Sequence, residues 1–483
     1  MTNMRSTASP GTPTQPPLRD IRRVFERQRE TALRLRTSTA AERIEKIKRL
    51  KEALQAHTPD IYAAGAADFR KPPEEIDLTE IIPVLGEANE AIRKLKRWMK
   101  PKRVWPSRAT WGHRGWIQYE PKGRCLIISP WNYPVNLTFG PLVSAIAAGN
   151  AVILKPSEMT PHLSALIVKI VREVFAETEV AIFEGDAGVA QALLEMPFDH
   201  IFFTGSPAVG KIVMAAAAKN LASVTLELGG KSPTIIDASA NLKEAARNTM
   251  WAKFTNNGQT CIAPDYVYVH SSVREKFVNL CRDTLKDFYG RDSEAQKTST
   301  DLARIVNERH TLRVKGLLDD ATGRGARVLV GGIVDEFTNF IAPTLLDNIP
   351  GDAKIMQEEI FGPLLPIVPF EHLDDVIARI NAAPKPLALY MWSRNKANIN
   401  SVLKKTSAGG TCINNSVIQY IHGHLPFGGV NNSGIGNSHG VYGFRSFSHE
   451  RAVLKTVISS NWLFYPPARS LGRMFVRWLK LFI

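Results

Sequence analysis

Short apolar segments alternate with helix-like segments along the chain from about residue 125. The runs CLIIS, AVILK, VAIFE, HIFFTG and SVTLEL are almost free of charge, and patterns such as HLSALIVKIVREVF lie between several of them. Strands that are apolar throughout are typical of a parallel sheet with helices on both faces. The alternation therefore predicts an α/β fold with a doubly wound parallel sheet, of the kind that binds nucleotides.

A second alternation follows Gly229, with the apolar runs PTIID, DYVYVH, ARVLVGG and LLPIVPF. It predicts a second α/β domain. This is expected, because a chain of 483 residues is too long to fold around one ordinary hydrophobic core. Upstream, residues 20–58 and 75–99 carry apolar residues three and four positions apart, which predicts helices. The alternating aromatics of WGHRGWIQYEP instead predict an extended ribbon.

The net charge of +15 raises the question of nucleic acid as a partner. The basic residues lie among acids on helix-like segments and form no recognition module, so we expect no nucleic acid. No apolar run reaches the roughly 18 residues of a transmembrane helix, and the start of the chain is typical of a disordered lead-in. The cysteines fit neither a disulfide framework nor a zinc site, which favours a cytoplasmic location without a metal; they are Cys125, Cys261, Cys281 and Cys412.

The C-terminal segment RSLGRMFVRWLKLFI has the pattern of a short basic amphipathic helix. Such a helix suits the surface of an anionic membrane, but it could equally dock on its own protein or on a partner subunit. We keep both interpretations. The apolar side comprises Leu471, Met474, Phe475, Trp478, Leu479 and Phe482, and the basic side Arg469, Arg473, Arg477 and Lys480.

Two segments contain candidate reactive or anion-binding groups. Cys261 lies among small polar residues in NNGQTCIAPD, where it is either an accessible nucleophile or a small space-filling residue. In HIFFTGSPAVGK, Gly205 and Gly210 flank a strand-to-helix turn. This turn either binds phosphate groups or is only a tight structural turn. The same stretch matches GxxxxGK, but Ile212 stands where a P-loop needs Ser or Thr.

Three further segments place polar groups at strand ends. Glu227 in LELGGK is either a general base or a carboxylate satisfied by backbone N–H groups. The amide of Asn132 in SPWNYP could stabilise an oxyanion. Lys155 and Glu158 in ILKPSE could bind ribose hydroxyls.

Taken in order, PWNYP, LKPSE, FTGSPAVG, LELGGK, NNGQTC, EEIFGP and LPFGGVNNSGIG resemble the signature segments of the aldehyde dehydrogenase superfamily, over roughly residues 20–465. APDYV, GFRSFSHERAV and the compact C-terminus are similar to the class 3 branch, which includes fatty aldehyde and coniferyl aldehyde dehydrogenases. Two small departures are GSPAVG for GSTAVG and NNGQTC for NSGQTC. Neither departure touches a reacting group.

The resemblance implies a mechanism. Cys261 would attack the aldehyde to give a thiohemiacetal, whose oxyanion is held by the Asn132 amide and the Cys261 N–H. Hydride transfer to a nicotinamide would leave a thioester, and water activated by Glu227 would hydrolyse it to the acid. A hydrophobic aldehyde, medium- or long-chain aliphatic or aromatic, is the expected substrate.

The resemblance also implies a cofactor site. NAD is expected and NADP is possible, because Glu158 can bond a 2′-hydroxyl but would repel a 2′-phosphate. The expected contacts are Trp131, Lys155, Glu158, Gly205, Ser206, Gly210, Leu228, Gly229, Glu359 and Phe361.

By the same resemblance the chain would form a homodimer through a small strand arm that includes residues near 101–119 and 434–456. The expected divisions are a lead-in over 1–18, an NAD(P)-binding domain over 19–228, a catalytic domain over 229–420, a return to the cofactor domain and arm over 421–465, and the C-terminal helix over 466–483.

Three alternatives remain. A CoA-acylating relative would release the acyl group to a thiol, and such members usually lack the carboxylate of Glu227. A P-loop-like nucleotide-binding protein would depend on Lys211. A membrane-associated scaffold would retain only a vestigial site.

Overall fold

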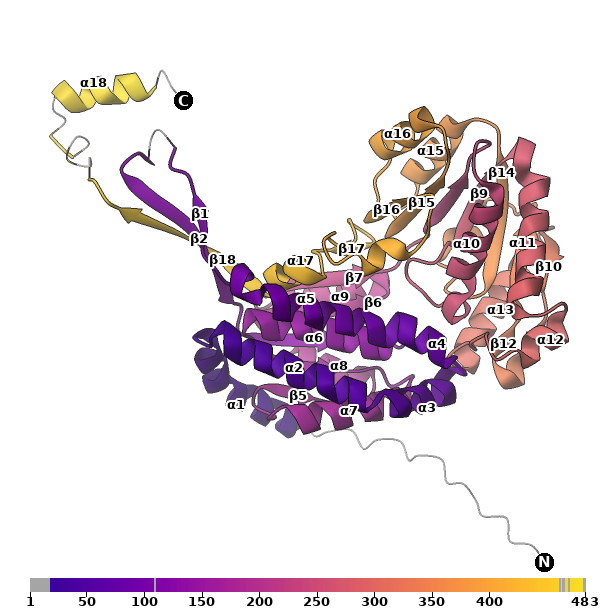
Figure 1. The fold of residues 1–483 in the computed structure, drawn as a ribbon, viewed down its shortest axis with the longest axis horizontal. Coiled ribbons are helices and arrows are strands. Elements are labelled where there is room, and N and C mark those ends of the chain that lie inside the picture. The colour runs from indigo at the N-terminus through magenta and orange to yellow at the C-terminus, as the bar shows by residue number, and fades with distance from the viewer. Residues whose placement is uncertain (1–17, 108–109, 460–461, 463–464, 468–469, 481–483) are drawn as a thin grey trace, which may run out of the picture.

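The structure is a computed structural model that describes residues 18–107, 110–459, 462, 465–467 and 470–480. Two α/β domains lie side by side, and a narrow arm projects from the first (Figure 1). The lead-in predicted for residues 1–18 falls almost wholly outside the described residues, apart from Leu18, which begins a helix.

The first domain contains a six-stranded sheet in the order β17-β7-β6-β3-β4-β5. All neighbours are parallel except β17, which runs antiparallel to β7. The five apolar runs predicted as strands of the first domain all form strands of this sheet. Its strands are β3 (Arg124–Ile128), β4 (Ala151–Lys155), β5 (Val180–Ile182), β6 (His200–Gly205), β7 (Ser223–Leu228) and β17 (Gly434–Ile435).

Helices cover both faces of this sheet, which confirms the doubly wound prediction. Along β3, Cys125 and Ile127 point into one core, whereas Leu126 and Ile128 point into the other. Each strand is therefore buried on both sides, as its continuous apolar sequence requires. One face carries α2 (Ala40–Ala56), α5 (Ile82–Trp98), α6 (Pro134–Ala148) and α7 (Pro161–Val174), and the other carries α1 (Leu18–Arg36), α8 (Ala187–Leu194) and α9 (Pro207–Ala218).

The helices predicted over residues 20–58 are two, α1 and α2, separated at Thr39. The Thr39 hydroxyl accepts from the Glu42 N–H, and the Glu42 carboxylate accepts from the Thr39 N–H at 2.6 Å, a capping box that starts α2. Two further helices, α3 (Thr58–Phe69) and α4 (Pro73–Ile76), follow. The helix predicted over residues 75–99 consists of the end of α4, the short π-helix η1 (Asp77–Ile81) and α5.

The second domain contains a seven-stranded sheet in the order β10-β13-β14-β9-β8-β15-β16, parallel except at β10. Its strands are β8 (Pro233–Ile236), β9 (Tyr266–His270), β10 (Arg327–Val330), β13 (Thr344–Asp347), β14 (Leu364–Phe370), β15 (Ala388–Trp392) and β16 (Gly410–Ile413). Its main helices are α10 (Leu242–Phe254), α11 (Arg274–Tyr289), α13 (Glu308–Gly323), α15 (Leu373–Ala382) and α16 (Lys396–Lys405).

The arm is a three-stranded antiparallel sheet in the order β1-β2-β18. The predicted ribbon is β2 (His113–Pro121), which pairs with β18 (Ser448–Thr456) along its whole length, while β1 (Lys102–Val104) covers its other edge. Residues 434–446, which we expected in the arm, belong to the first domain instead. They form β17, on the edge of the first sheet, and α17 (Gly440–Ser446), which packs on α5 and α6.

The C-terminal helix is α18 (Ser470–Leu479), which lies beyond the end of the arm (Figure 1). Leu471, Met474 and Trp478 are each about half exposed or more, at 57%, 65% and 48%. Arg469 and Phe482 of the expected pattern lie outside the described residues. Among the described residues, no helix is both long and apolar enough to cross a bilayer.

Candidate active site

Two cavities meet at Cys261, between the two domains. Cys261, Glu227 and Thr204 line both of them. One is an apolar cavity of about 170 Å³, and the other, more polar, holds about 1140 Å³. Thr204 and Glu227 stand near the carboxyl ends of β6 and β7, where ligands bind in open parallel sheets.

A left-handed turn after α10 sets the position of Cys261. Asn256 and Asn257 have φ of 50° and 51°, and Gly258 follows with φ of 77°. Asparagine tolerates this region better than most side chains, which suits it to position 257. A Cβ on Gly258 would lie 2.3 Å from the Gly362 carbonyl oxygen, so glycine lets the turn pack against the loop of EEIFGP.

Cys261 is partly exposed, whereas the other three cysteines are buried. Burial raises the pKa of its thiol, and the carboxyl groups of Glu359 and Glu227 raise it further, while the N–H groups of Cys261 and Ile262 oppose them. The free protein therefore holds a thiol here, not a ready thiolate. For this sulfur to act as a nucleophile, a base would first have to accept its proton.

Glu227 has the properties of that base. No backbone N–H of a described residue donates to either carboxyl oxygen, which contradicts the interpretation that backbone N–H groups of the turn satisfy it. Burial raises its pKa to about 7, although Ser438 and His439 partly oppose the rise. A carboxyl group that titrates near neutral pH can accept and release protons in a catalytic cycle.

Asn132 is held rigidly beside the cysteine turn. Its side-chain amide donates to the Gln259 carbonyl at 3.0 Å, which leaves one amide hydrogen unused. The backbone carbonyl of Asn132 accepts hydrogen bonds from Asn256 Nδ2 at 2.9 Å and from Lys71 Nζ at 3.2 Å. Lys71 in turn pairs with Glu80 at 3.3 Å, with both side chains buried. The residues that hold this candidate oxyanion donor in place, Lys71, Glu80 and Asn256, were not singled out in the sequence.

Six of the expected cofactor contacts line the larger cavity. The helix α9 also begins there, after Ser206, whose hydroxyl caps it by accepting from the Val209 N–H. A helix N-terminus with glycine before it favours an anion such as a pyrophosphate, so the cavity fits a dinucleotide in size and in chemistry. The six residues are Trp131, Gly205, Ser206, Gly229, Glu359 and Phe361.

The other expected contacts do not line this cavity. A Cβ on Gly210 would lie 2.7 Å from the Leu228 side chain, so Gly210 lets α9 pack on β7, and its assignment to the phosphate turn gains no support here. Lys155 is buried, and its Nζ binds Glu158 at 2.8 Å beyond the end of β4. Their predicted contact with ribose stays a prediction.

The loop that carries Glu359 is fixed by charged residues that sequence reasoning missed. Lys231 pairs with Asp265 and donates to the Glu358 carbonyl at 2.9 Å. Asp265 accepts from the Ile360 N–H at 2.9 Å, and Arg313 donates to the Ile360 carbonyl at 2.5 Å. The signal was available in part, since Asp265 directly precedes the apolar strand β9.

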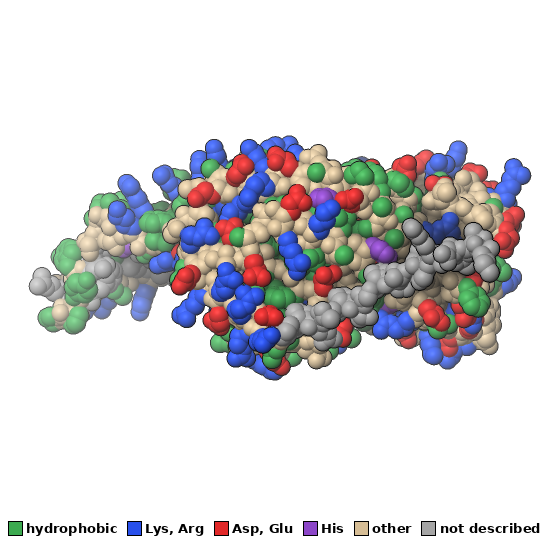
Figure 2. Space-filling view, turned by 90° about the horizontal axis from the view of Figure 1, so that it is seen from below, with side chains coloured by type: hydrophobic (Ala, Val, Ile, Leu, Met, Phe, Trp, Pro, Cys, Tyr) green, Lys and Arg blue, Asp and Glu red, His purple; other side chains and the backbone are tan. Residues whose placement is uncertain are grey.

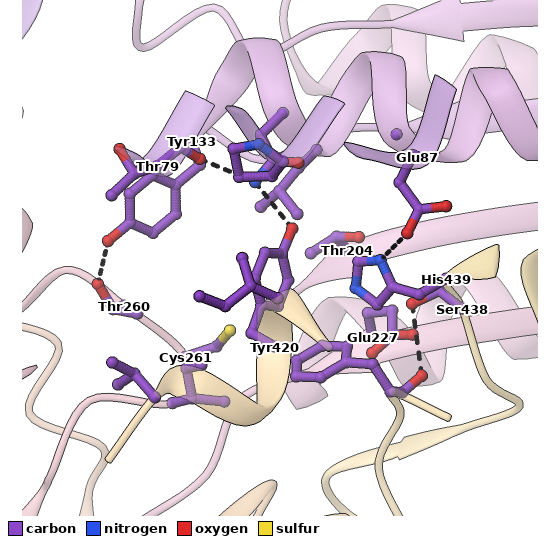
Figure 3. A pocket seen from close by; sticks show the side chains of 18 of the residues that line it. Thr79, Glu87, Tyr133, Thr204, Glu227, Thr260, Cys261, Tyr420, Ser438 and His439 are labelled. Carbon is purple, nitrogen blue, oxygen red and sulfur yellow. Dashed lines mark hydrogen bonds and ion pairs between the residues drawn. The ribbon is translucent and has the colours of Figure 1, made fainter. Parts of the chain in front are cut away.

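The smaller cavity is lined mainly by apolar and aromatic groups (Figure 3). The Tyr133 hydroxyl bonds Thr260 at 2.5 Å, and the Tyr420 hydroxyl accepts from Asn136 Nδ2 at 2.8 Å, so both phenols are satisfied by protein. Several apolar lining residues are also well exposed at the surface, so the entrance of the cavity is apolar; they are Leu78, Trp251, Ile418 and Ile421.

The profile of the aldehyde dehydrogenase family matches residues 12–453. The Bacillus subtilis protein AldX is 48% identical over 434 residues, which cover 90% of this chain and 97% of that protein. The 4,4'-diaponeurosporen-aldehyde dehydrogenase of Staphylococcus aureus is 42% identical, covering 88% and 92%. Aldehyde dehydrogenase family 3 member A2 of Pongo abelii is 41% identical, covering 96% and 93%.

Solved structures agree with these sequence relationships. The substrate-bound state of Staphylococcus aureus AldH matches with a TM-score of 0.90 at 40% identity, covering 95% of this chain and 99% of that one. The NAD+ complex of a Bacillus cereus aldehyde dehydrogenase matches with a TM-score of 0.82 at 28% identity, covering 92% and 90%.

Proposed function

Because this chain belongs to the aldehyde dehydrogenase family and has class 3 relatives, we propose that it oxidises hydrophobic aldehydes to carboxylic acids through a thioester on Cys261. The observation that carries the proposal is the junction at Cys261, where an apolar cavity suited to an aldehyde meets a larger one suited to a dinucleotide. A thiol at this point can reach both ligands.

The first step forms a carbon–sulfur bond. Glu227 accepts the thiol proton, sulfur attacks the aldehyde carbon, and the oxyanion receives hydrogen bonds from the Asn132 amide and the Cys261 N–H. Bound NAD(P) would supply the hydride acceptor for the oxidation to the thioester.

Hydrolysis follows at the same residues. After releasing its proton to solvent, Glu227 accepts one from water, whose oxygen attacks the thioester carbon and expels the Cys261 sulfur. The presence of this carboxyl group favours water over CoA as the acyl acceptor.

The lining of the smaller cavity supports a hydrophobic substrate. Apolar walls stabilise a hydrocarbon chain or ring by roughly 0.8 kcal/mol per buried methylene. A relative in Staphylococcus aureus is named for the aldehyde of a 4,4'-diaponeurosporene, which is consistent with this class.

A panel of aldehydes of increasing chain length, each assayed with NAD and with NADP, tests the function and the coenzyme together. We expect free acid, rising kcat/KM with chain length, and a preference for NAD that Glu158→Gln weakens. Product that forms only when CoA is added, or ATP turnover dependent on Lys211, would reverse the assignment.

Gly229→Ala is expected to weaken coenzyme binding by about tenfold or more. A Cβ at position 229 would lie 2.2 Å from Glu359 Oε2, so the Glu359 carboxyl group must leave the cavity wall. Titration of NAD binding by calorimetry measures the effect. Gly316→Ala is the matched control, because its Cβ meets nothing within 4 Å on α13; equal affinity in both variants would contradict the prediction.

The arm and α18 support two proposals about assembly. Among the described residues, no strand pairs with the outer edges of β1 and β18, so a second copy could pair there and we expect a homodimer, which sedimentation equilibrium tests. Exposed Leu471, Met474 and Trp478 beside Arg477 favour peripheral contact with an anionic membrane.

Deleting the residues after Pro467 is expected to remove this membrane contact. Binding is measured by flotation with vesicles rich in phosphatidylserine. The fraction of the truncated protein bound to them should fall to the level that neutral vesicles give, because both the apolar and the basic residues are lost. Unchanged flotation together with an unchanged chain-length preference would show that the helix only packs on protein.

A further inference from the structure

A buried histidine stands on the wall of the substrate cavity, held by a carboxylate from another part of the chain. His439 Nδ1 lies 2.7 Å from Glu87 Oε1 on α5, and the Gly440 N–H donates to Glu87 Oε2 at 2.9 Å. Both side chains are only about a tenth exposed. His439 has a φ of 71°, a conformation unfavourable for residues other than glycine, so the contacts with Glu87 hold it against local strain.

The second ring nitrogen of His439 has no hydrogen-bond partner among the described residues. Nε2 is buried and makes no hydrogen bond with any described residue. Buried polar groups of this kind are rare and call for an explanation. Figure 3 shows the ring between Glu87 and Glu227, and His439, Glu227 and Cys261 all line the same cavity.

The charges around His439 favour its protonated form. Burial lowers its pKa, but the ion pair and hydrogen bond with Glu87, together with the charge of Glu227, outweigh burial and leave the pKa above its ordinary value. The effect is mutual, because His439 lowers the pKa of Glu227 and that of Glu87.

Other groups near this histidine do not compete for its charge. The Tyr420 ring packs edge-on against it with centroids 4.7 Å apart, and the Tyr420 hydroxyl is bound to Asn136. Glu90, next to Gly440, already pairs with Lys94 at 2.6 Å. The titratable groups left facing it are Glu87 on one side and Glu227 and Cys261 on the cavity side.

We propose that the His439–Glu87 pair is a positioning element that holds a positive charge beside Glu227 and so favours the ionised carboxylate that accepts a proton from water during thioester hydrolysis. The proposal rests on the function proposed above. A hydrophobic substrate that fills the cavity excludes water, which strengthens the attraction between the imidazolium and the carboxylate. Without that positive charge, burial would be opposed by Ser438 only, and a larger share of Glu227 would be protonated and unable to accept a proton from water.

The test is the pH dependence of steady-state kcat for His439→Gln and Glu87→Gln in the full-length protein. The acid limb, where Glu227 becomes protonated, should move up by about one pH unit in both variants, since an opposite charge at short range lowers a carboxyl pKa by that order. At pH 9, where Glu227 is ionised anyway, kcat should approach that of the unmodified protein. His439→Lys keeps a positive charge, so its acid limb should move up by less than in the other two variants.

Two comparisons make the result specific. His424→Gln removes an exposed histidine from the same segment and should leave the profile unchanged. At pH 9, where Glu227 is ionised and can accept the thiol proton, stopped-flow NADH formation in the first turnover should show a full burst in both variants. An acid limb at the unmodified pH in both variants, or an equal loss of kcat at every pH, would overturn the proposal. Absence of aldehyde oxidation in the unmodified protein would instead refute the proposed function.

Discussion

Replacing Cys261 with alanine is expected to abolish aldehyde oxidation, by at least about 10³-fold in kcat/KM, while the protein stays folded. The loss should be this large because removal of the nucleophile deletes the covalent pathway and leaves only binding and electrostatic effects. The fold should persist, since a partly exposed sulfur contributes about 1 kcal/mol or less to stability. NADH formation with a long-chain aldehyde measures the first quantity, and thermal unfolding the second.

Cys281→Ala is the matched control, because Cys281 is buried in the core between α11 and the second sheet, away from both cavities. It should retain activity. Iodoacetamide gives an independent test, since Cys261 is the one cysteine that is not buried and we expect one label per chain together with loss of turnover. Full activity after complete labelling of Cys261, or in Cys261→Ser, would rule out a sulfur nucleophile.

The sequence predicted the two sheets well, for a physical reason. A strand buried on both faces needs apolar residues at every position, so AVILK and HIFFTG coincide with β4 and β6. The arm was harder to delimit. Residues 434–446 carry no continuous apolar run, and their place on the first domain depends on the pairing of β17 with Leu226 and Glu227, far away in sequence.

The grouping of the candidate residues was also predictable, but their electrostatic state was not. Motif order placed Cys261, Glu227 and Asn132 together, and all three line the larger cavity. The raised pKa of the Cys261 thiol results from burial and from Glu359, which comes from a separate loop. Such an effect exists only in the folded chain, where the loop of Glu359 packs beside the cysteine turn.

Long-range pairs were invisible to local reasoning. His439 and Glu87 stand 352 positions apart, and neither sits in a segment whose pattern marks a charge pair. Lys71 reaches Asn132 across 61 positions in the same way. Gly210 shows a different difficulty, because a glycine in a phosphate-binding turn and a glycine required for helix packing look alike in sequence.

Replacing Glu227 with glutamine is expected to separate the two halves of the reaction. If Glu227 acts mainly on water, the first turnover should still release about one NADH per site, and later turnovers should slow by roughly 10²- to 10³-fold, the usual contribution of a general base. If it is also the sole acceptor of the thiol proton, the burst itself should slow. Stopped-flow absorbance at NADH wavelengths distinguishes these outcomes, and mass spectrometry should detect acylated Cys261.

The pH dependence of the unmodified protein supplies the matching evidence. A general base must be deprotonated, so the rate of hydrolysis should rise with pH and reach half its plateau near pH 7, the pKa to which burial raises Glu227. In Glu227→Gln this rise should disappear from the slow phase, because no titrating base remains beside the thioester. The exposed Glu244→Gln on α10 should keep both the rise and the rate. A slow phase in Glu227→Gln that still follows the pH 7 transition would assign the base to another group.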